Sequence, residues 1–215
     1  MDINGLFEIH ITVDKNDDYY KLWSYTFNKK DFKLILAVSD IGVHKEQFMI
    51  SKWKNGTVSE AIDKANKIAK DMIVHGIKVE RVKVESMAHN PGVPDSDEDF
   101  NKIKENFVVG KPYFEFHAKI DIMSNTLEDS IYWCNERHKS YSSEIHLAIS
   151  ANICGSGSPL LTIRIYDHGR NYSIRVKNEI LDNLKKDGYK VIGNIQQEFS
   201  IYDTNDNMDK GWLIL

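Results

Sequence analysis

The chain has 215 residues, of which 41% are hydrophobic and 28% are charged. This balance excludes an intrinsically disordered chain and leaves enough apolar material for one large core or two small ones. The formal net charge of -4 excludes a global basic field that would draw the chain onto nucleic acid or anionic lipid. The net charge does not exclude a local basic patch.

Targeting features are absent from the sequence. No apolar run reaches the roughly 18 residues of a membrane helix, and residues 1–5 lack the basic-then-apolar order of a signal peptide. Cys134 and Cys154 are too few for a disulfide framework, so we expect free thiols in a reducing compartment. The sequence therefore predicts a cytoplasmic protein with no membrane partner.

The first half of the chain alternates strand and helix patterns. Apolar and polar side chains alternate over residues 7–13, which is the two-residue period of a strand. A longer helix is expected after the capping candidates Thr57 and Ser59, and it ends at Gly76. The expected elements, in chain order, are a strand at 7–13, a helix at about 17–25, strands at 34–39 and 48–56, the helix before Gly76, and a strand that carries Arg81, Lys83 and Glu85.

Residues 91–109 have the composition of a connector. Proline and glycine at 91–94 are followed by an acidic run at 95–99, which is typical of a loop. A short helical turn is expected near residues 100–107. We interpret this segment as a linker between two larger units.

The second half repeats the first in the same order. Residues 114–120 match residues 7–13, and three further segments also recur in order. The expected elements are a strand at 114–120, a helix at about 126–137, strands at 145–150 and 161–166, a helix after the cap candidate Ser173 that ends at Gly188, and a strand that continues through Ile201. The apolar end at 212–215 is expected to pack against the rest of the chain.

This duplication predicts the fold class. Strand-helix-strand-strand-helix-strand is the ferredoxin-like order, in which helices cover one face of an antiparallel sheet. We therefore expect an α+β protein with two tandem ferredoxin-like repeats, at residues 1–90 and 110–215, related by pseudo-twofold symmetry. Residues 91–109 are the acidic linker between them.

Strand alternation also predicts which side chains lie on the uncovered sheet faces. Charged groups are seldom buried unless paired, so a face built from them is hydrated. In both halves a glutamate stands two residues before a histidine. The predicted site residues are Glu8, His10, Thr12, Ser39, Ser51, Lys83 and Glu85 in the first half, and Glu115, His117, Lys119, His146, Ser150, Arg164, Tyr166 and Glu198 in the second.

The two histidines carry the functional hypothesis. If the two faces look at each other, His10 and His117 become facing partners that act as general base and general acid. Cationic side chains, Lys83, Lys119 and Arg164, would then hold a phosphate together with Thr12. In a second arrangement the halves join edge to edge into one continuous sheet, and the polar faces are exposed separately.

Short motifs on these strands resemble known families. His10-Ile11-Thr12-Val13 resembles the His-x-Thr-apolar strand motif of two-histidine phosphoesterases, bilobal enzymes that act on cyclic phosphates and nucleic-acid ends. The second copy, His117-Ala118-Lys119-Ile120, has lysine at the Thr position. Residues 115–119 also resemble the Glu-x-Glu-x-Lys strand of triphosphate-tunnel enzymes. Over nearly its full length the chain is most similar to an uncharacterised bacterial two-repeat family, which implies no known activity.

These observations lead to two functional hypotheses. The first is a phosphate-ligand binding protein for a nucleotide or RNA end, with metal-independent phosphoesterase activity and no cofactor. The alternative is a non-catalytic module whose polar faces bind a nucleotide, a peptide or a second copy of the chain as a homodimer. A metal site built from His10, His117, His146 and neighbouring glutamates is disfavoured because no tight ligand spacing supports it. No extended nucleic-acid surface is expected.

Overall fold

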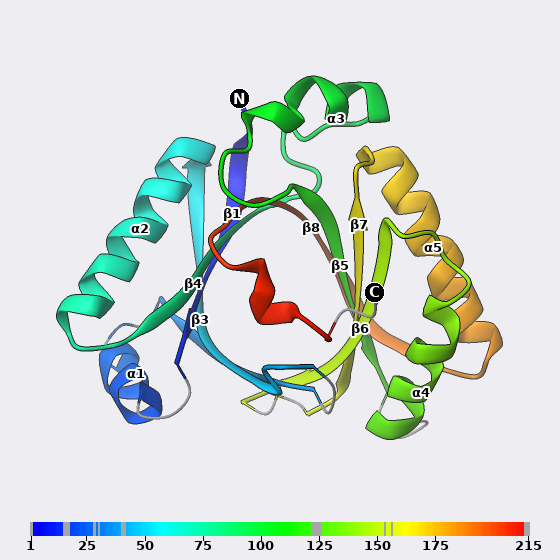
Figure 1. Cartoon of the computed structure of the whole chain (residues 1–215), viewed down its shortest axis with the longest axis horizontal. Coiled ribbons are helices and arrows are strands. Elements are labelled where there is room, and N and C mark those ends of the chain that lie inside the picture. The colour runs from blue at the N-terminus through cyan, green and yellow to red at the C-terminus, as the bar shows by residue number, and fades with distance from the viewer. Residues whose placement is uncertain are drawn as a thin grey trace.

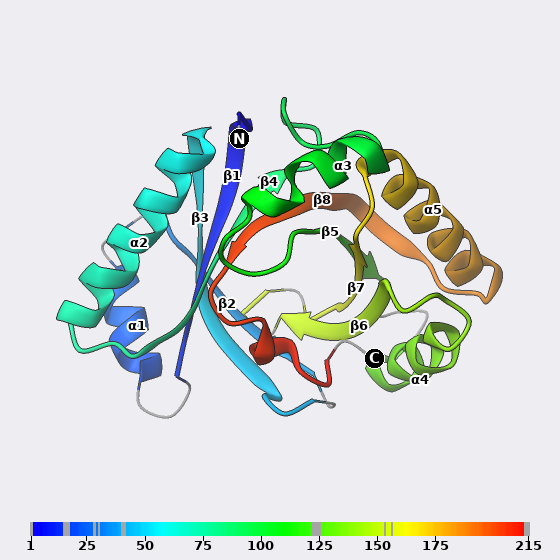
Figure 2. The same ribbon diagram turned by 45° about the horizontal axis from the view of Figure 1, so that its top comes forward.

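The computed structural model describes residues 2–14, 18–27, 29, 31–39, 42–121, 126–152, 154–155 and 157–212. Within these residues the chain forms an α+β structure with five α-helices and eight antiparallel strands (Figure 1). The strands pair in one closed ring in the order β1-β3-β2-β6-β7-β5-β8-β4. Helices α1, α2, α4 and α5 lie on the outside of this ring (Figures 1 and 2).

Both halves follow the predicted order of strand, helix, strand, strand, helix and strand. The first half consists of β1 (Asn4–Val13), α1 (Asp18–Phe27), β2 (Lys33–Val38), β3 (Glu46–Thr57), α2 (Val58–Val74) and β4 (Val79–Met87). The second consists of β5 (Tyr113–Ile120), α4 (Leu127–His138), β6 (Ile145–Asn152), β7 (Pro159–Tyr166), α5 (Arg170–Lys186) and β8 (Val191–Asp203). Between them lie α3 (Asp97–Ile103) and the 3-10 turn η1 (Lys104–Asn106), and a second 3-10 turn, η2 (Asp206–Asp209), follows β8.

Helix capping confirms one predicted start and corrects another. The Thr57 hydroxyl accepts a hydrogen bond from the backbone of Glu60 and completes a capping box at the start of α2. The predicted cap of α5 at Ser173 is wrong, because α5 begins after Gly169 and Ser173 lies inside its first turn. There the Ser173 hydroxyl donates to the Gly169 carbonyl at 2.9 Å.

The hydrophobic core lies between the ring and the helices. Outward-pointing side chains of β1, such as Phe7, Ile9 and Ile11, are almost completely buried in the same apolar cluster as Ala65 and Met72 of α2. This packing explains the alternation seen in the sequence, since every second residue must be apolar to face the helices. The intervening residues point into the ring and are free to be polar.

Closure of the sheet differs from the expectation of two separate sheets. Strand β4 pairs with β8, and β2 pairs with β6, so the two halves share one sheet. The tandem ferredoxin-like repeats are therefore not confirmed as separate units. The edge-to-edge arrangement is correct about how the halves meet. The expectation that the polar faces are exposed separately is wrong, because strand pairing at both edges directs these faces into the ring and leaves neither edge unpaired.

The segment after β8 crosses one opening of the ring, where Figure 1 shows it in red. The backbone carbonyl of Met208 and the Asp209 carboxylate accept hydrogen bonds from Gln47 of β3, at 2.8 and 3.0 Å. Trp212 is buried against Ala148 and Ala37. The predicted packing of the apolar end is thus confirmed for Trp212, while residues 213–215 lie outside the described residues.

Within the described residues, the helices are all too short or too polar for one to cross a membrane.

Gly169 tests the junction between α3 and α5. A methyl group at Gly169 would lie 2.3 Å from the carbonyl carbon of Ser96, so Gly169→Ala forces backbone apart and should cost about 3 kcal/mol of unfolding free energy. At Gly155 the nearest atom is the Asn152 side-chain amide at 3.3 Å, and Gly155→Ala should cost less than about 0.5 kcal/mol. Urea unfolding of both variants measures the difference, and equal midpoints would contradict this packing.

Candidate functional site

A cavity of about 380 Å³ lies inside the ring, and all eight strands contribute to its wall. Small eight-stranded barrels usually fill their interior with side chains or hold one small ligand. Here the inward side chains are largely charged or polar, and the cavity falls within the roughly 300–1,000 Å³ typical of small-molecule sites. The ring interior is therefore the candidate site.

Most of the predicted site residues lie together on this wall. They come from strands of both halves, which confirms that the two polar faces share one cavity. These wall residues are Glu8, His10, Thr12, Lys83, Glu85, Glu115, His117, Lys119, Ser150, Arg164 and Glu198.

Four predicted site residues lie off the wall and have other partners. The Ser39 hydroxyl donates to the Ile149 carbonyl at 3.0 Å, and the Ser51 hydroxyl donates to Glu8. His146 contacts the Ser143 carbonyl at 2.9 Å and packs edge-on against Tyr166, with ring centroids 5.2 Å apart. Their predicted contact with a ligand is thus replaced by contacts within the protein, of which the one from Ser51 supports a wall carboxylate.

Each of the two histidines lies between two carboxylates. His10 Nε2 is 3.7 Å from Glu8 Oε1 and 3.3 Å from Glu85 Oε2. His117 Nε2 is 3.2 Å from Glu115 Oε1 and 3.5 Å from Glu198 Oε2. The two centres are built alike, because each glutamate pair combines a residue of the histidine's own strand with one from the neighbouring strand.

Three cations on the wall are already compensated by carboxylates. Lys83 Nζ lies 2.7 Å from Glu85 and 2.9 Å from Glu115. Arg164 Nε donates to Glu115 at 2.6 Å, and its Nη2 donates to Asp209 at 2.9 Å. Because buried charges persist only when paired, this network holds the site together, and it leaves Lys83 and Arg164 little charge to offer a phosphate.

Arg81 is the third compensated cation. It donates to both oxygens of Asp203, at 2.8 and 2.5 Å, and to both oxygens of Asp209, at 2.9 and 3.0 Å. Asp209 therefore joins Arg81 of the first half to Arg164 of the second. Sequence reasoning missed Asp209 because it lies in a 3-10 turn, where no strand period assigns it to a face.

Two other lysines on the wall have no carboxylate partner among the residues that the structure describes. Lys119 on β5 and Lys33 on β2 are exposed at the side-chain level and line the same cavity. Within the described part of the chain neither ammonium group forms an ion pair. Lys119 was predicted to bind phosphate, whereas Lys33 was missed although it precedes the inward-facing Ile35 and Ala37 by the same two-residue period.

Burial and neighbouring charges push the carboxyl groups in opposite directions. Burial acts to raise the pKa of Glu115, but Arg164 and Lys83 hold this pKa well below its ordinary value. Burial, with Glu85 and Glu8 nearby, raises the pKa of Glu198 well above its ordinary value. Burial also opposes ionisation of Glu8, yet His10 and the Ser51 hydroxyl lower its pKa on balance. Neighbouring carboxyl groups whose pKa values are shifted in opposite directions are typical of proton-transfer sites.

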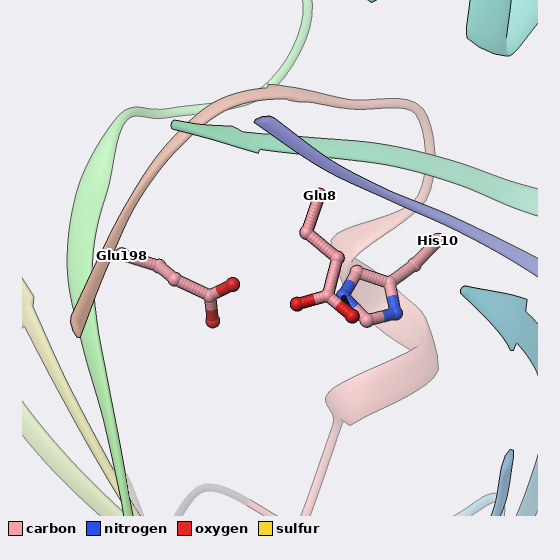
Figure 3. A group of neighbouring side chains, drawn as sticks. All are labelled: Glu8, His10 and Glu198. Carbon is pink, nitrogen blue, oxygen red and sulfur yellow. Dashed lines mark ion pairs between the residues drawn. The ribbon is translucent and has the colours of Figure 1, made fainter. Parts of the chain in front are cut away.

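Glu8, His10 and Glu198 form a close cluster, with ligand-type atoms all within 4.8 Å of one another (Figure 3). Glu8 and His10 come from β1, and Glu198 comes from β8 in the other half. Gln196 bridges the carboxylates, since its Nε2 donates to Glu8 at 2.6 Å and to Glu198 at 2.7 Å. This cluster is also the set of described side chains that could hold a metal ion.

Comparison with known proteins adds no identity to this site. The chain matches no family model, no curated protein and no solved structure.

The Asp209 link makes stability depend on pH in a defined direction. Arg81 and Arg164 hold the pKa of Asp209 far below its ordinary value of 3.8, against the effect of burial. A depressed carboxyl pKa adds stability that is present above the ordinary value and lost as the pH falls. Asp209→Asn should therefore cost about 3 kcal/mol at pH 7, and the difference from wild type should shrink below about pH 4.

The control for this variant is Asp206→Asn, in the same turn but exposed. It should change stability by less than about 0.5 kcal/mol. Denaturant unfolding across pH 3–8 measures both, and a loss at Asp209 that does not vary with pH would contradict the assigned charge pairing.

Proposed function

We propose that the chain binds a phosphate-bearing ligand, a nucleotide or an RNA end, inside the ring and hydrolyses a phosphate ester there. One observation carries the proposal. Two imidazoles set between carboxylates open onto the same cavity as two lysines that have no carboxylate partner within the described residues. The cavity thus combines groups that exchange protons with groups that attract an anion.

Lys119 and Lys33 are the groups we assign to phosphate binding. An ammonium group binds phosphate as a point charge, and its strength depends on not being neutralised already. Lys83 and Arg164, the other expected phosphate contacts, each hold two carboxylates. The assignment therefore keeps Lys119 from the sequence hypothesis and replaces the other two cations with Lys33.

The carboxylate and imidazole groups are assigned to the reaction itself. In hydrolysis, water forms a bond to phosphorus while the ester oxygen leaves, so one proton must be taken from water and one given to the leaving oxygen. His10 and His117, each backed by two glutamates, supply groups for both transfers. The two histidines occupy equivalent places on β1 and β5, whereas two-histidine phosphoesterases carry the motif after a preceding strand and helix, so the assignment rests on the geometry of the cavity.

We also infer that the two halves are copies of one ferredoxin-like unit. The strand order is β4-β1-β3-β2 in one half and β8-β5-β7-β6 in the other, with the same sequence of elements. Doubling such a unit and pairing its edges would give this ring. It would also explain why Glu8 and His10 recur as Glu115 and His117.

A binding protein without turnover is the second candidate. The observation that favours it is that Nε2 of each histidine already lies against carboxylates, which limits its contact with a ligand. Binding of a peptide or a second chain through open sheet faces loses its support, because these faces line the ring interior.

A nucleotide panel tests the proposal. Purified protein is incubated with cyclic and linear nucleotides and short RNA ends, and release of phosphate monoester or free phosphate is followed. His117→Ala should lower kcat by about 100-fold or more, since it removes a proton-transfer group. Lys119→Ala should raise KM about 10-fold with a smaller effect on kcat, since it removes a ground-state phosphate contact.

The matched control is His89→Ala, an exposed histidine outside the cavity, which should leave kcat and KM unchanged. Turnover by the wild type that survives His117→Ala would contradict the catalytic assignment. Nucleotide binding that weakens in Lys119→Ala, with no turnover by the wild type, would favour the binding protein instead.

A further inference from the structure

The cluster of Glu8, His10 and Glu198 has the size of a metal site. The ligand-type atoms lie within 4.8 Å of one another. Metal–ligand bonds of roughly 2.0–2.6 Å place atoms on opposite sides of one ion up to about 5 Å apart, so three such atoms can reach a single cation. Figure 3 shows the carboxylates of Glu8 and Glu198 directed toward each other, beside the His10 ring.

Two buried atoms of this cluster have no hydrogen-bond partner in the described part of the chain. Glu198 is completely buried, and its Oε2 accepts no hydrogen bond; His117 Nε2 stands 3.5 Å away. His10 Nδ1 is also buried without a hydrogen-bond partner. Buried polar atoms are nearly always paired, so the unpaired oxygen of Glu198 points to a ligand that accepts its electron pair, and His10 Nε2, which faces the carboxylates, is the ring nitrogen that could share that ligand.

The charges around the cluster also favour a bound cation. Glu85 and Glu115 are paired with Lys83 or Arg164, but neither Glu8 nor Glu198 contacts a lysine or arginine within the described chain. The two carboxylates are instead bridged by the neutral amide of Gln196. Two neighbouring buried carboxylates without a fixed cation need either a shared proton or a bound cation in place of that proton, because burying negative charge uncompensated is costly.

We propose that Glu8, His10 and Glu198 bind one divalent transition-metal cation inside the ring, with Gln196 as a positioning residue. Two carboxylate oxygens and one imidazole nitrogen form a mixed donor set that suits Mn²⁺, Fe²⁺ or Zn²⁺ better than Ca²⁺ or Mg²⁺. The set keeps His10 and neighbouring glutamates from the combination considered from the sequence and omits His117 and His146, of which His146 lies off the cavity wall. A reaction that uses this cation would also replace the metal-independent reaction expected from the sequence.

The site deepens the proposed function and changes one assignment in it: His10 would be a metal ligand instead of a proton-transfer group, and His117 keeps its role. The existence of the metal site rests on the cluster alone. A bound divalent cation would attract phosphate oxygens and lower the pKa of a bound water, which are the roles a hydrolase needs. Lys119 and Lys33 would then hold the part of the phosphate that is turned away from the cation. Metal binding can be measured without any substrate, so the two proposals can fail separately.

Mn²⁺ is the probe, added to the metal-free full-length protein and followed by the EPR signal of free Mn²⁺. The wild type should bind one Mn²⁺ per chain, and pulsed EPR should show coupling to an imidazole nitrogen. Glu198→Gln should weaken binding at least about 10-fold, and His10→Gln should also abolish the nitrogen coupling. Gln196→Ala should weaken binding about 10-fold, as loss of a ligand-orienting contact does.

The controls are His89→Ala, outside the cavity, and Lys119→Ala, on its wall, and both should bind Mn²⁺ like the wild type. Glu8→Gln serves as a second ligand variant if circular dichroism shows that Glu198→Gln does not fold. No Mn²⁺ binding by the wild type at millimolar concentration, equal affinity in all ligand variants, or Ca²⁺ preferred over Mn²⁺ would overturn the metal site.

Activity separates this proposal from the previous one. Mn²⁺ binding without phosphoester hydrolysis would overturn the hydrolase and support the metal site. Hydrolysis that persists in EDTA, by a protein that binds no Mn²⁺, would overturn the metal site and support the hydrolase.

Discussion

Compensation of buried charge inside a closed ring is the constraint on which this structure depends. The outer face of the sheet packs largely against helices, so most polar residues of the alternating pattern point inward. An interior of carboxylates and cations is stable only if its charges are paired. Arg81, Lys83 and Arg164 supply that pairing, and they leave Glu8 and Glu198 as the carboxylates without a lysine or arginine contact among the described residues.

The same constraint separates structural from functional charge. A lysine or arginine that is paired with two carboxylates stabilises the fold, whatever its distance from a ligand. Lys119 and Lys33 hold none within the described residues, so their charge is available to an anion that enters the cavity. The chemistry proposed for the site follows from this division, with anion binding on lysines at the wall and proton or metal chemistry at the carboxylate and imidazole groups.

Much of this arrangement could be predicted from the sequence, because it follows from the two-residue alternation of polar and apolar side chains along each strand. Alternation along residues 7–13 and 114–120 placed Glu8, His10, Glu115 and His117 on one face correctly, and the repeat made the two strands equivalent. Ring closure could not be predicted, since the pairing of β2 with β6 depends on backbone groups that every sequence carries. The role of Asp209 could not be predicted for a related reason. A turn residue follows no strand alternation, and its two arginine partners are more than forty positions away in the sequence.

The two seams between the halves are unequal, and this has a consequence for exchange with solvent. The β4–β8 seam pairs five residues on each strand, from Lys83 to Met87, whereas the β2–β6 seam pairs only Ala37 and Val38 of β2 among the described residues. Local opening costs least where the fewest backbone hydrogen bonds must break. The short seam borders the cavity beside Ala37 and Asn152, so backbone amides of this seam should exchange with solvent faster than those of the β4–β8 seam.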